Sequence, residues 1–276
     1  GKELAFIEDR NRLMVLNLET KKVRRITDGS TWYSTSGGFD YAWSPDSKWF
    51  TLEFIGNKHD PYSDIGLVSA QGNGEIINLT NSGYSSGSPS FALDGNAILF
   101  TTERYGMRAH ASWGSLDDAM LVFLNQDAYD KFSLSKEDYE LYKEANSDRK
   151  KVAAKDSSKV KDVVVELKNI EDRIVRLTPN SSNMGSTLIS KDGKALYYLA
   201  STESGRNLWK MDLNKKETKL LHKVDAGWTS LEMDKEGKTL FILNGKNMQK
   251  MNLASDDLKP IKYLAQVKLD LSAERE

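Results

Sequence analysis

The sequence has no cysteine in its 276 residues, and this absence removes several kinds of chemistry. Without thiols there is no disulfide, no cysteine nucleophile and no cysteine-ligated zinc site. The cellular compartment stays open, because many exported proteins also lack cysteine. The fold must therefore be held together by its core, and a chain of this length can bury a sizeable one.

The chain also lacks an excess of charge of either sign and any long apolar run. Its 39 basic and 40 acidic residues leave a formal net charge of −1. Because nucleic-acid binding needs a strongly basic face, we expect no nucleic-acid partner. No apolar stretch approaches the roughly 20 residues of a membrane-spanning helix, so we expect no membrane span. With 39% hydrophobic and 29% charged residues, the composition is that of an ordinary globular protein.

The first residues contain no recognisable targeting segment. Gly1 and Lys2 stand where an initiator methionine would be, and the strand-like stretch 4–7 follows at once. We interpret this start as a cut edge, so that any signal peptide would lie outside these residues. A periplasmic and a cytoplasmic location both stay open.

What the sequence does contain is a repeated unit of strands and turns. A short apolar strand leads into a Ser-Pro-Asp-Gly-like turn and a second strand; a third strand ends in Asp/Asn-Leu and a fourth in Leu-Thr. Copies begin at 41–54, 89–100, 188–199 and 231–243, and 3–27 supplies a copy without its first strand. Asp46 and Asp94 lie 48 residues apart, and Asp192 and Glu236 lie 44 apart. Both spacings are typical of four-stranded propeller blades of about 40–50 residues.

The turns and the alternation of the strands explain why the repeats favour a propeller. Gly95, Gly193 and Gly237 each follow an acidic residue and allow the positive φ of a tight hairpin. A single four-stranded blade cannot bury both of its faces, so blades must stack around an axis. We therefore predict an all-β fold, a β-propeller segment over 1–276 with about five visible blades. A larger propeller of which these blades are a part stays open, and the alternative fold is a β-sandwich.

The repeat is interrupted over 106–162, an insertion that we place within the third visible blade. Residues 119–124 read as a strand. Ser135 to Asp138 reads as a capping box, and the residues after it are apolar at helical spacing. We expect the blade to resume with a strand over 163–167 and to finish at 174–178. Insertions in repeat folds often form the binding face, but a solvated decoration or a packing element is an equally open interpretation.

Parts of the sequence resemble a known family. The blades alone resemble the propellers of Tol-type proteins and of prolyl oligopeptidases. The stretch Arg104-Tyr105-Gly106-Met107-Arg108-Ala109-His110-Ala111-Ser112-Trp113-Gly114 resembles the second propeller of tricorn-type proteases. So do Phe123-Leu124-Asn125-Gln126 with Asp130-Lys131-Phe132, the segment 163–178 around Ile170-Glu171-Asp172-Arg173, and the tail 266–276.

This resemblance implies a large multidomain serine peptidase as the parent protein. In that family the propellers act as a sieve or path for oligopeptides, and a separate C-terminal part holds the serine nucleophile. The family's second propeller is expected to have seven blades, whereas about five are visible here. Either the first blades lie outside this sequence, or the protein closes a smaller ring, in which the strand-like tail at 266–271 would pair with the first blade.

The sequence offers no catalytic constellation of its own. A serine triad needs a base placed against an activated hydroxyl. We interpret His59 as a surface-loop residue and His222 as a strand-edge residue, and there is no Gly-x-Ser-x-Gly motif. No histidine pair stands at metal-ligand spacing, so we expect neither a metal nor a cofactor.

The family-like loop is the candidate site for peptide contact. Arg104 and Arg108 can pair with a peptide carboxylate, while Tyr105 and Trp113 offer apolar contact. For His110 we expect a binding or structural role.

Three functions compete on the sequence alone. The first is a non-catalytic propeller segment that guides or filters oligopeptides, with peptides and the catalytic domains of its own parent chain as partners and with oligomers formed through the parent. The second is a stand-alone Tol-type propeller that binds a protein partner. The third is a propeller that itself hosts chemistry, which needs a cluster of acids or histidines at the central channel that the sequence does not show at recognisable spacing.

Overall fold

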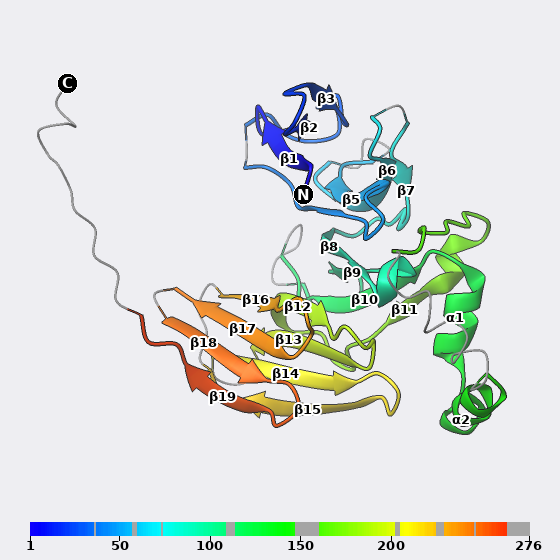
Figure 1. Cartoon of the computed structure of the whole chain (residues 1–276), viewed down its shortest axis with the longest axis vertical. Coiled ribbons are helices and arrows are strands. Elements are labelled where there is room, and N and C mark those ends of the chain that lie inside the picture. The colour runs from blue at the N-terminus through cyan, green and yellow to red at the C-terminus, as the bar shows by residue number, and fades with distance from the viewer. Residues whose placement is uncertain are drawn as a thin grey trace, which may run out of the picture.

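The computed structural model describes residues 1–35, 37–56, 60–72, 74–108, 114–146, 160–201, 205–224, 229–245 and 247–263. These residues form five antiparallel sheets that follow one another along the chain and along an arc in space (Figure 1). No helix in these ranges is long and apolar enough to cross a membrane.

Each sheet consists of strands that are consecutive in sequence and hydrogen-bonded in that order. The first sheet has β1 (Glu3–Glu8), β2 (Arg12–Asn17) and β3 (Val23–Arg25); the second has β4 (Tyr41–Trp43), β5 (Trp49–Phe54), β6 (Asp64–Ser69) and β7 (Ile77–Asn78). The third has β8 (Ser86–Ala92), β9 (Ala97–Thr102), β10 (Asp118–Phe123) and β11 (Ile174–Arg176). The fourth has β12 (Asn183–Ile189), β13 (Ala195–Ser201), β14 (Arg206–Asp212) and β15 (Glu217–His222); the fifth has β16 (Thr229–Met233), β17 (Thr239–Asn244), β18 (Asn247–Asn252) and β19 (Asp257–Pro260).

The core lies between the sheets, as stacking of blades requires. Alternate residues of β13 point to opposite faces, because successive side chains of a strand do. Leu196, Tyr198 and Ala200 pack with the third sheet. Ala195, Tyr197 and Leu199 pack with Leu231, Leu240 and Ile242 of the fifth sheet. The predicted all-β propeller of four-stranded blades is confirmed, and the first sheet lacks one strand, as the sequence indicated.

The Leu-Thr ending of a blade has a physical role. The Thr80 hydroxyl accepts from the Ile65 amide at 3.1 Å and donates to the Asp64 carboxylate at 2.6 Å. Thr178 repeats both contacts in the third blade, with the Ala119 amide and with Asp118. In the first blade, the Thr27 hydroxyl accepts from the Leu13 amide at 2.9 Å. This hydroxyl fastens the end of the fourth strand to the beginning of the third.

The turn between the first two strands of a blade is also held by side chains. The Ser44 hydroxyl donates to Asp46 at 2.5 Å and accepts from the Trp49 amide at 2.9 Å. Ser190 makes the same pair of contacts, with Asp192 at 2.7 Å and with the Ala195 amide at 2.9 Å. The Ser-x-Asp part of the repeat is therefore a device that closes the turn.

The region predicted as one insertion, 106–162, forms two connections at opposite ends of the third blade, with the strand β10 (Asp118–Phe123) between them. The β9–β10 connection lies at the end of the blade where β8 begins, and β10 itself is a central, fully buried strand of the sheet. The chain after β10 lies at the other end and forms α1 (Gln126–Ser133), α2 (Lys136–Ala145) and the 3-10 turn η3 (Ile170–Arg173). Ser135 caps α2 by accepting from the Asp138 amide at 3.1 Å, as its sequence predicted.

The prediction of a strand over 163–167 is wrong, because β10 already occupies the third position in the sheet. These residues instead run beside the blade as extended chain outside any strand. The Val163 amide donates to Asp46 of the second blade at 2.8 Å. Buried Arg173 donates to the carbonyls of Phe123, at 3.1 Å, and of Lys168, at 2.9 Å.

We name the two ends of the blades for use below. The loop face carries the connections at 80–85, 103–108 and 178–182. The turn face carries the turns at 44–48, 93–96, 190–194 and 234–238, together with α1 and α2. The first and fifth sheets stand at the two ends of the arc (Figure 1), and no core cluster of the described residues joins them.

Candidate functional site

Three of the five predicted contact residues, Arg104, Tyr105 and Arg108, lie together on the loop face. They follow the end of β9 at Thr102, close to where the inner strand β8 begins. His110 and Trp113 lie outside the described residues, as does His59.

Backbone contacts hold this loop in a defined path. The Leu116 amide donates to the Met107 carbonyl at 3.1 Å, and Arg108 and Ser115 form a β-bridge. A Cβ on Gly106 would stand 1.7 Å from the Leu116 carbonyl oxygen, so no other residue fits there without a shift of the backbone. The glycine thus lets the two sides of the loop approach each other closely, which positions the residues on either side of it.

Two arginines contact the Tyr105 ring. The guanidinium carbon of Arg176 is 5.0 Å from the ring centroid and that of Arg104 is 5.6 Å from it. The Arg176 guanidinium is itself held by buried Asp118, with Nε 3.0 Å and Nη2 2.9 Å from the same carboxylate oxygen. Cation–π contacts of this kind stabilise by about 0.5–1 kcal/mol at exposed sites. Tyr105 still exposes 48% of its surface, so it is available to a ligand.

A second pair of the same kind adjoins the loop. The Arg108 guanidinium carbon is 5.7 Å from the ring centroid of Tyr84, which belongs to the connection between the second and third blades and is 37% exposed. We call Tyr84, Arg104, Tyr105, Arg108 and Arg176 the Arg–Tyr patch. Sequence analysis missed Tyr84 and Arg176, because each reaches the loop from a different connection or strand.

Partly buried carboxyl groups also lie on the loop face. Burial, with the neighbouring Glu103 and Asp118, raises the pKa of Asp117 to about 6. Burial, with the nearby Asp40 carboxylate, raises the pKa of Glu53 to about 7. The Glu53 carboxylate accepts from the Ser88 amide at 2.7 Å and from the Asp40 amide at 3.3 Å. This face therefore holds acids with raised pKa values as well as the arginines of the Arg–Tyr patch.

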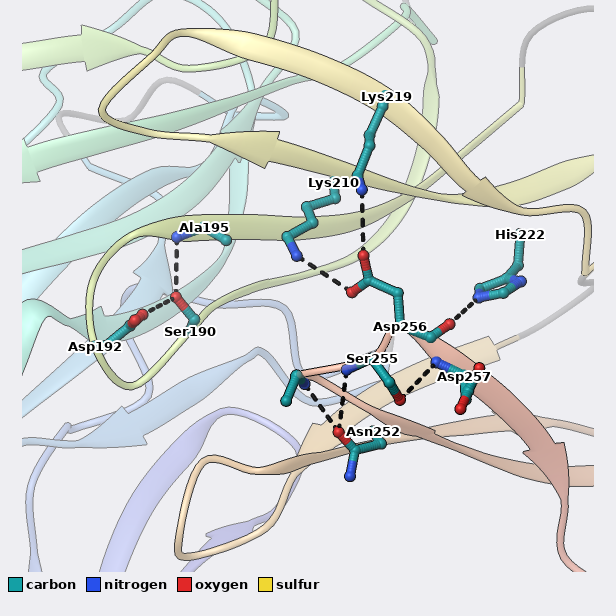
Figure 2. Close-up of polar contacts among 11 residues, drawn as sticks. Ser190, Asp192, Ala195, Lys210, Lys219, His222, Asn252, Ser255, Asp256 and Asp257 are labelled. Carbon is teal, nitrogen blue, oxygen red and sulfur yellow. Dashed lines mark hydrogen bonds and ion pairs between the residues drawn. The ribbon is translucent and has the colours of Figure 1, made fainter.

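His222, the one histidine among the described residues, helps to hold a turn between two blades (Figure 2). Its Nε2 is 2.7 Å from the main-chain carbonyl oxygen of Asp256. Lys210 and Lys219 each place an ammonium 3.2 Å from an oxygen of the Asp256 carboxylate. Three side chains of β14 and β15 thus hold the β18–β19 turn, which joins the fifth blade to the fourth. The described residues contain no cluster of three or more histidines or acids that can hold a metal ion.

Comparison with known proteins supports the resemblance seen in the sequence. No family model matches the chain. A curated protein of Sulfurisphaera tokodaii, named as a tricorn-like protease C-terminal subunit, is 26% identical over an alignment of 255 residues that covers 88% of this chain. The chain spans only 26% of the length of that relative. The similarity to tricorn-like proteases expected from the sequence is thereby confirmed.

Solved structures show the same fold. The tricorn protease superposes with a TM-score of 0.64 at 13% identity, covering 95% of this chain and 25% of its own. TolB from Acinetobacter baumannii superposes with a TM-score of 0.56 at 16% identity, covering 93% of this chain and 50% of its own. At such low identity these likenesses establish the β-propeller fold and nothing more.

Proposed function

We propose that this chain is a non-catalytic β-propeller segment of a tricorn-like serine peptidase, where it guides or filters oligopeptide substrates and docks against the catalytic domains. The Arg–Tyr patch is the observation that carries this proposal. The similarity to a tricorn-like protease subunit supports a peptidase parent, and the 26% of that relative's length covered here supports a part that acts with other domains.

The chemistry of the patch suits an extended peptide. Neither Arg104 nor Arg108 has an ion-pair partner among the described residues, so each guanidinium is available to a peptide carboxylate. The partly exposed rings of Tyr84 and Tyr105 offer flat apolar surface to side chains of many kinds. Contacts of this strength are weak one by one, which suits a surface that must pass peptides onward.

The proposal places the chemical step outside this chain. Nε2 of His222 is engaged with the main-chain carbonyl of Asp256, and the described residues show no hydroxyl bonded to the ring. We therefore assign the nucleophile and its base to another part of the parent protein. We also take 1–276 as one propeller segment, whose third blade is interrupted within 106–162 on either side of β10.

Arg104→Ala combined with Arg108→Ala in the full-length parent tests the role of the patch. We expect kcat/KM for oligopeptides to fall by roughly tenfold and the distribution of cleavage products to change, because two charge-assisted contacts are lost. The measurement is product analysis by mass spectrometry together with initial rates.

The matched control is Arg104→Lys with Arg108→Lys, which keeps the charge and removes the planar guanidinium. We expect it to recover part of the rate. An unchanged rate and product pattern in the double alanine variant, with its thermal unfolding also unchanged, would falsify the proposed role and would favour a Tol-type protein-binding module.

A further inference from the structure

Two acidic residues stand together at the loop-face end of the third blade. The paired part of β9 and β10 ends with Thr102 opposite Asp118, and Glu103 and Asp117 are the next residue on each strand. Residues that face each other across adjacent strands point to the same side of a sheet, where like charges destabilise it. We call Glu103 and Asp117 the acid pair. Because the pair works against the fold, we looked for a ligand that it could meet.

The acid pair faces the fourth blade. Successive residues of a strand point to opposite sides, and Ala119 and Leu121, which share the side of Asp117, pack against the fourth sheet next to them (Figure 1). Asp118 and the residues in phase with it point the other way, to the core shared with the second blade. On that side Asp118 holds Arg176. The arginine that neutralises Asp118 is therefore on the opposite side of the blade from the acid pair.

A buried hydroxyl lies on the same side as the acid pair. Ser182 forms a β-bridge with Asp117, in which the two amides donate to the two carbonyls at 2.8 and 3.0 Å, so their side chains share one face. The next residues show the same phase on the other face, where the Ser181 hydroxyl donates to Asp118 at 2.7 Å. Ser182 is only 8% exposed, and its Oγ has no hydrogen-bond partner among the described residues. A buried hydroxyl without a partner is costly, so this one is placed to meet a ligand.

The acid pair has no counter-charge within the part of the chain that the structure describes. No lysine or arginine there forms an ion pair with Glu103 or with Asp117. Both residues are partly exposed, so a ligand can reach them. Burial, with the carboxylates of Glu103 and Asp118, raises the pKa of Asp117 to about 6, which is the response of an acid without a cation beside it. The position thus offers negative charge, and a cation is what it lacks.

We propose that the acid pair and Ser182 bind a primary ammonium group of a peptide, either its amino terminus or a lysine side chain. An ammonium group has three N–H donors, and two carboxylates with one hydroxyl oxygen supply three acceptors. Hydrogen bonds between charged groups of this kind are the stronger ones in proteins. A divalent metal ion fits less well, because the described residues contain no group of three acids or histidines that can hold one.

This inference rests on the function proposed above and adds the orientation of the bound peptide. The Arg–Tyr patch lies on the second-blade side of the third blade, since Asp118 holds its Arg176 and its Tyr84 belongs to the connection from the second blade. The acid pair lies on the fourth-blade side. A peptide that contacts both therefore crosses the end of the third blade, with its carboxylate toward the second blade and its ammonium group toward the fourth.

The test uses the whole chain and four forms of one eight-residue peptide, which has no charged side chain and carries an uncharged dye on a central cysteine. One form is free at both ends, one is acetylated, one is amidated, and one is acetylated with lysine as its first residue. In fluorescence anisotropy titrations at pH 7, we expect acetylation to weaken binding roughly tenfold. Recovery of affinity by the lysine form assigns the site to any primary ammonium, and its absence assigns the site to the amino terminus.

The capped forms separate this inference from the proposed function. Equal affinity of the free and acetylated forms would overturn the ammonium site. If amidation still weakened binding in that case, the function proposed for the Arg–Tyr patch would stand without the orientation inferred here. If neither cap changed the affinity, both proposals would fail.

Glu103→Gln combined with Asp117→Asn locates the site. We expect this variant to bind the free peptide roughly tenfold more weakly and to bind the free and acetylated forms equally. Its thermal unfolding temperature is expected to be unchanged or raised, because two repelling charges are removed. Ser182→Ala is expected to weaken binding of the free peptide roughly threefold without lowering stability, since the hydroxyl has no partner to lose.

Glu171→Gln combined with Asp172→Asn is the matched control. Both residues are exposed acids of η3, at the other end of the same blade, so the charge change is the same and we expect wild-type binding. Equal losses in the two double variants would reduce the effect to net charge and would contradict the site. A difference between the free and acetylated peptides that disappears on adding EDTA would assign the acid pair to a divalent metal ion and would also overturn the inference.

Discussion

Replacing Asp118 by alanine is expected to lower the free energy of unfolding by about 3 kcal/mol, because it strips a buried ionic network of its anion. The side chain of Asp118 is fully buried, and its carboxylate accepts from Arg176, from the Thr178 hydroxyl at 2.8 Å and from the Ser181 hydroxyl at 2.7 Å. The Arg176 side chain is 34% exposed, so water offsets part of the loss and we expect the lower end of the range for buried pairs. Urea denaturation followed by tryptophan fluorescence measures the change.

Two further variants separate the ionic contact from closure of the blade. Asp118→Asn keeps an acceptor for Thr178 and is expected to cost less than Asp118→Ala. Asp64→Ala removes the equivalent acid of the second blade. Its partners are Asn78, Thr80 and the Ser82 amide, and no cation among the described residues pairs with it. We expect only the Asp118 variants to change the surroundings of Tyr105, since only there does the acid hold Arg176. A loss below about 1 kcal/mol for Asp118→Ala would contradict the role assigned to this network.

Glu53→Gln is expected to stabilise the protein at pH 8 by up to about 3 kcal/mol while changing its stability little near pH 4.5. Burial, reinforced by Asp40, raises the pKa of Glu53 to about 7 from an ordinary value of 4.5. The folded state therefore holds this proton more tightly than the unfolded state. The contribution of the Glu53 carboxyl to the free energy of unfolding is fully present below pH 4.5 and is lost as the pH rises through about 7. The glutamine cannot ionise, and its oxygen can still accept from the Ser88 amide.

The measurement is the urea midpoint of wild type and Glu53→Gln at intervals between pH 4.5 and pH 8. Glu75→Gln serves as the control, because Glu75 is an exposed acid in a turn of the second blade. Parallel pH profiles for wild type and Glu53→Gln would show that the Glu53 carboxyl titrates as an exposed acid does. A growing advantage of the glutamine variant with rising pH is the expected outcome.

The blades were predictable because their determinants are local. Ser44 with Asp46 and Ser190 with Asp192 close turns within a few residues of themselves, and the same letters recur at the same place in the unit. The threonine that ends a blade acts over a longer distance, yet it too recurs in order and marks its strand. Ser135 likewise marks the start of α2, because its hydroxyl accepts from the amide of Asp138 three residues later.

The course of the chain through the third blade was less predictable, because it is decided by contacts distant in sequence. Residues 118–123 and 163–167 are both apolar and strand-like, and only one stretch can occupy the position beside β9. The former pairs along its full length, from Asp118 opposite Thr102 to Phe123 opposite Ala97. The side chain of Arg173 then donates to the carbonyl of Glu166 in the other stretch and to that of Lys168 just after it, a role that its sequence neighbours do not reveal.

The candidate site shows the same division. Arg104, Tyr105 and Arg108 were found from one continuous loop, whereas Tyr84 and Arg176 reach it from elsewhere in the fold. In the alternation of side chains along β5, Glu53 occupies a position that the sequence predicts to face solvent. The adjoining inner strand covers it, with Gly87 so close that an added Cβ would lie 2.5 Å from the Glu53 carboxylate. Its raised pKa follows from that contact between blades.

Photo-crosslinking of a peptide to this chain tests the central claim most directly. The probe is an oligopeptide with a free carboxylate and one benzoylphenylalanine, irradiated with the protein and mapped by mass spectrometry of the digested adduct. The account predicts adducts on the loop face, in the segment from Tyr84 to Arg108 and around Arg176, that diminish in the variant with Arg104→Ala and Arg108→Ala. Adducts absent from that face, or unaffected by the double substitution, would contradict it.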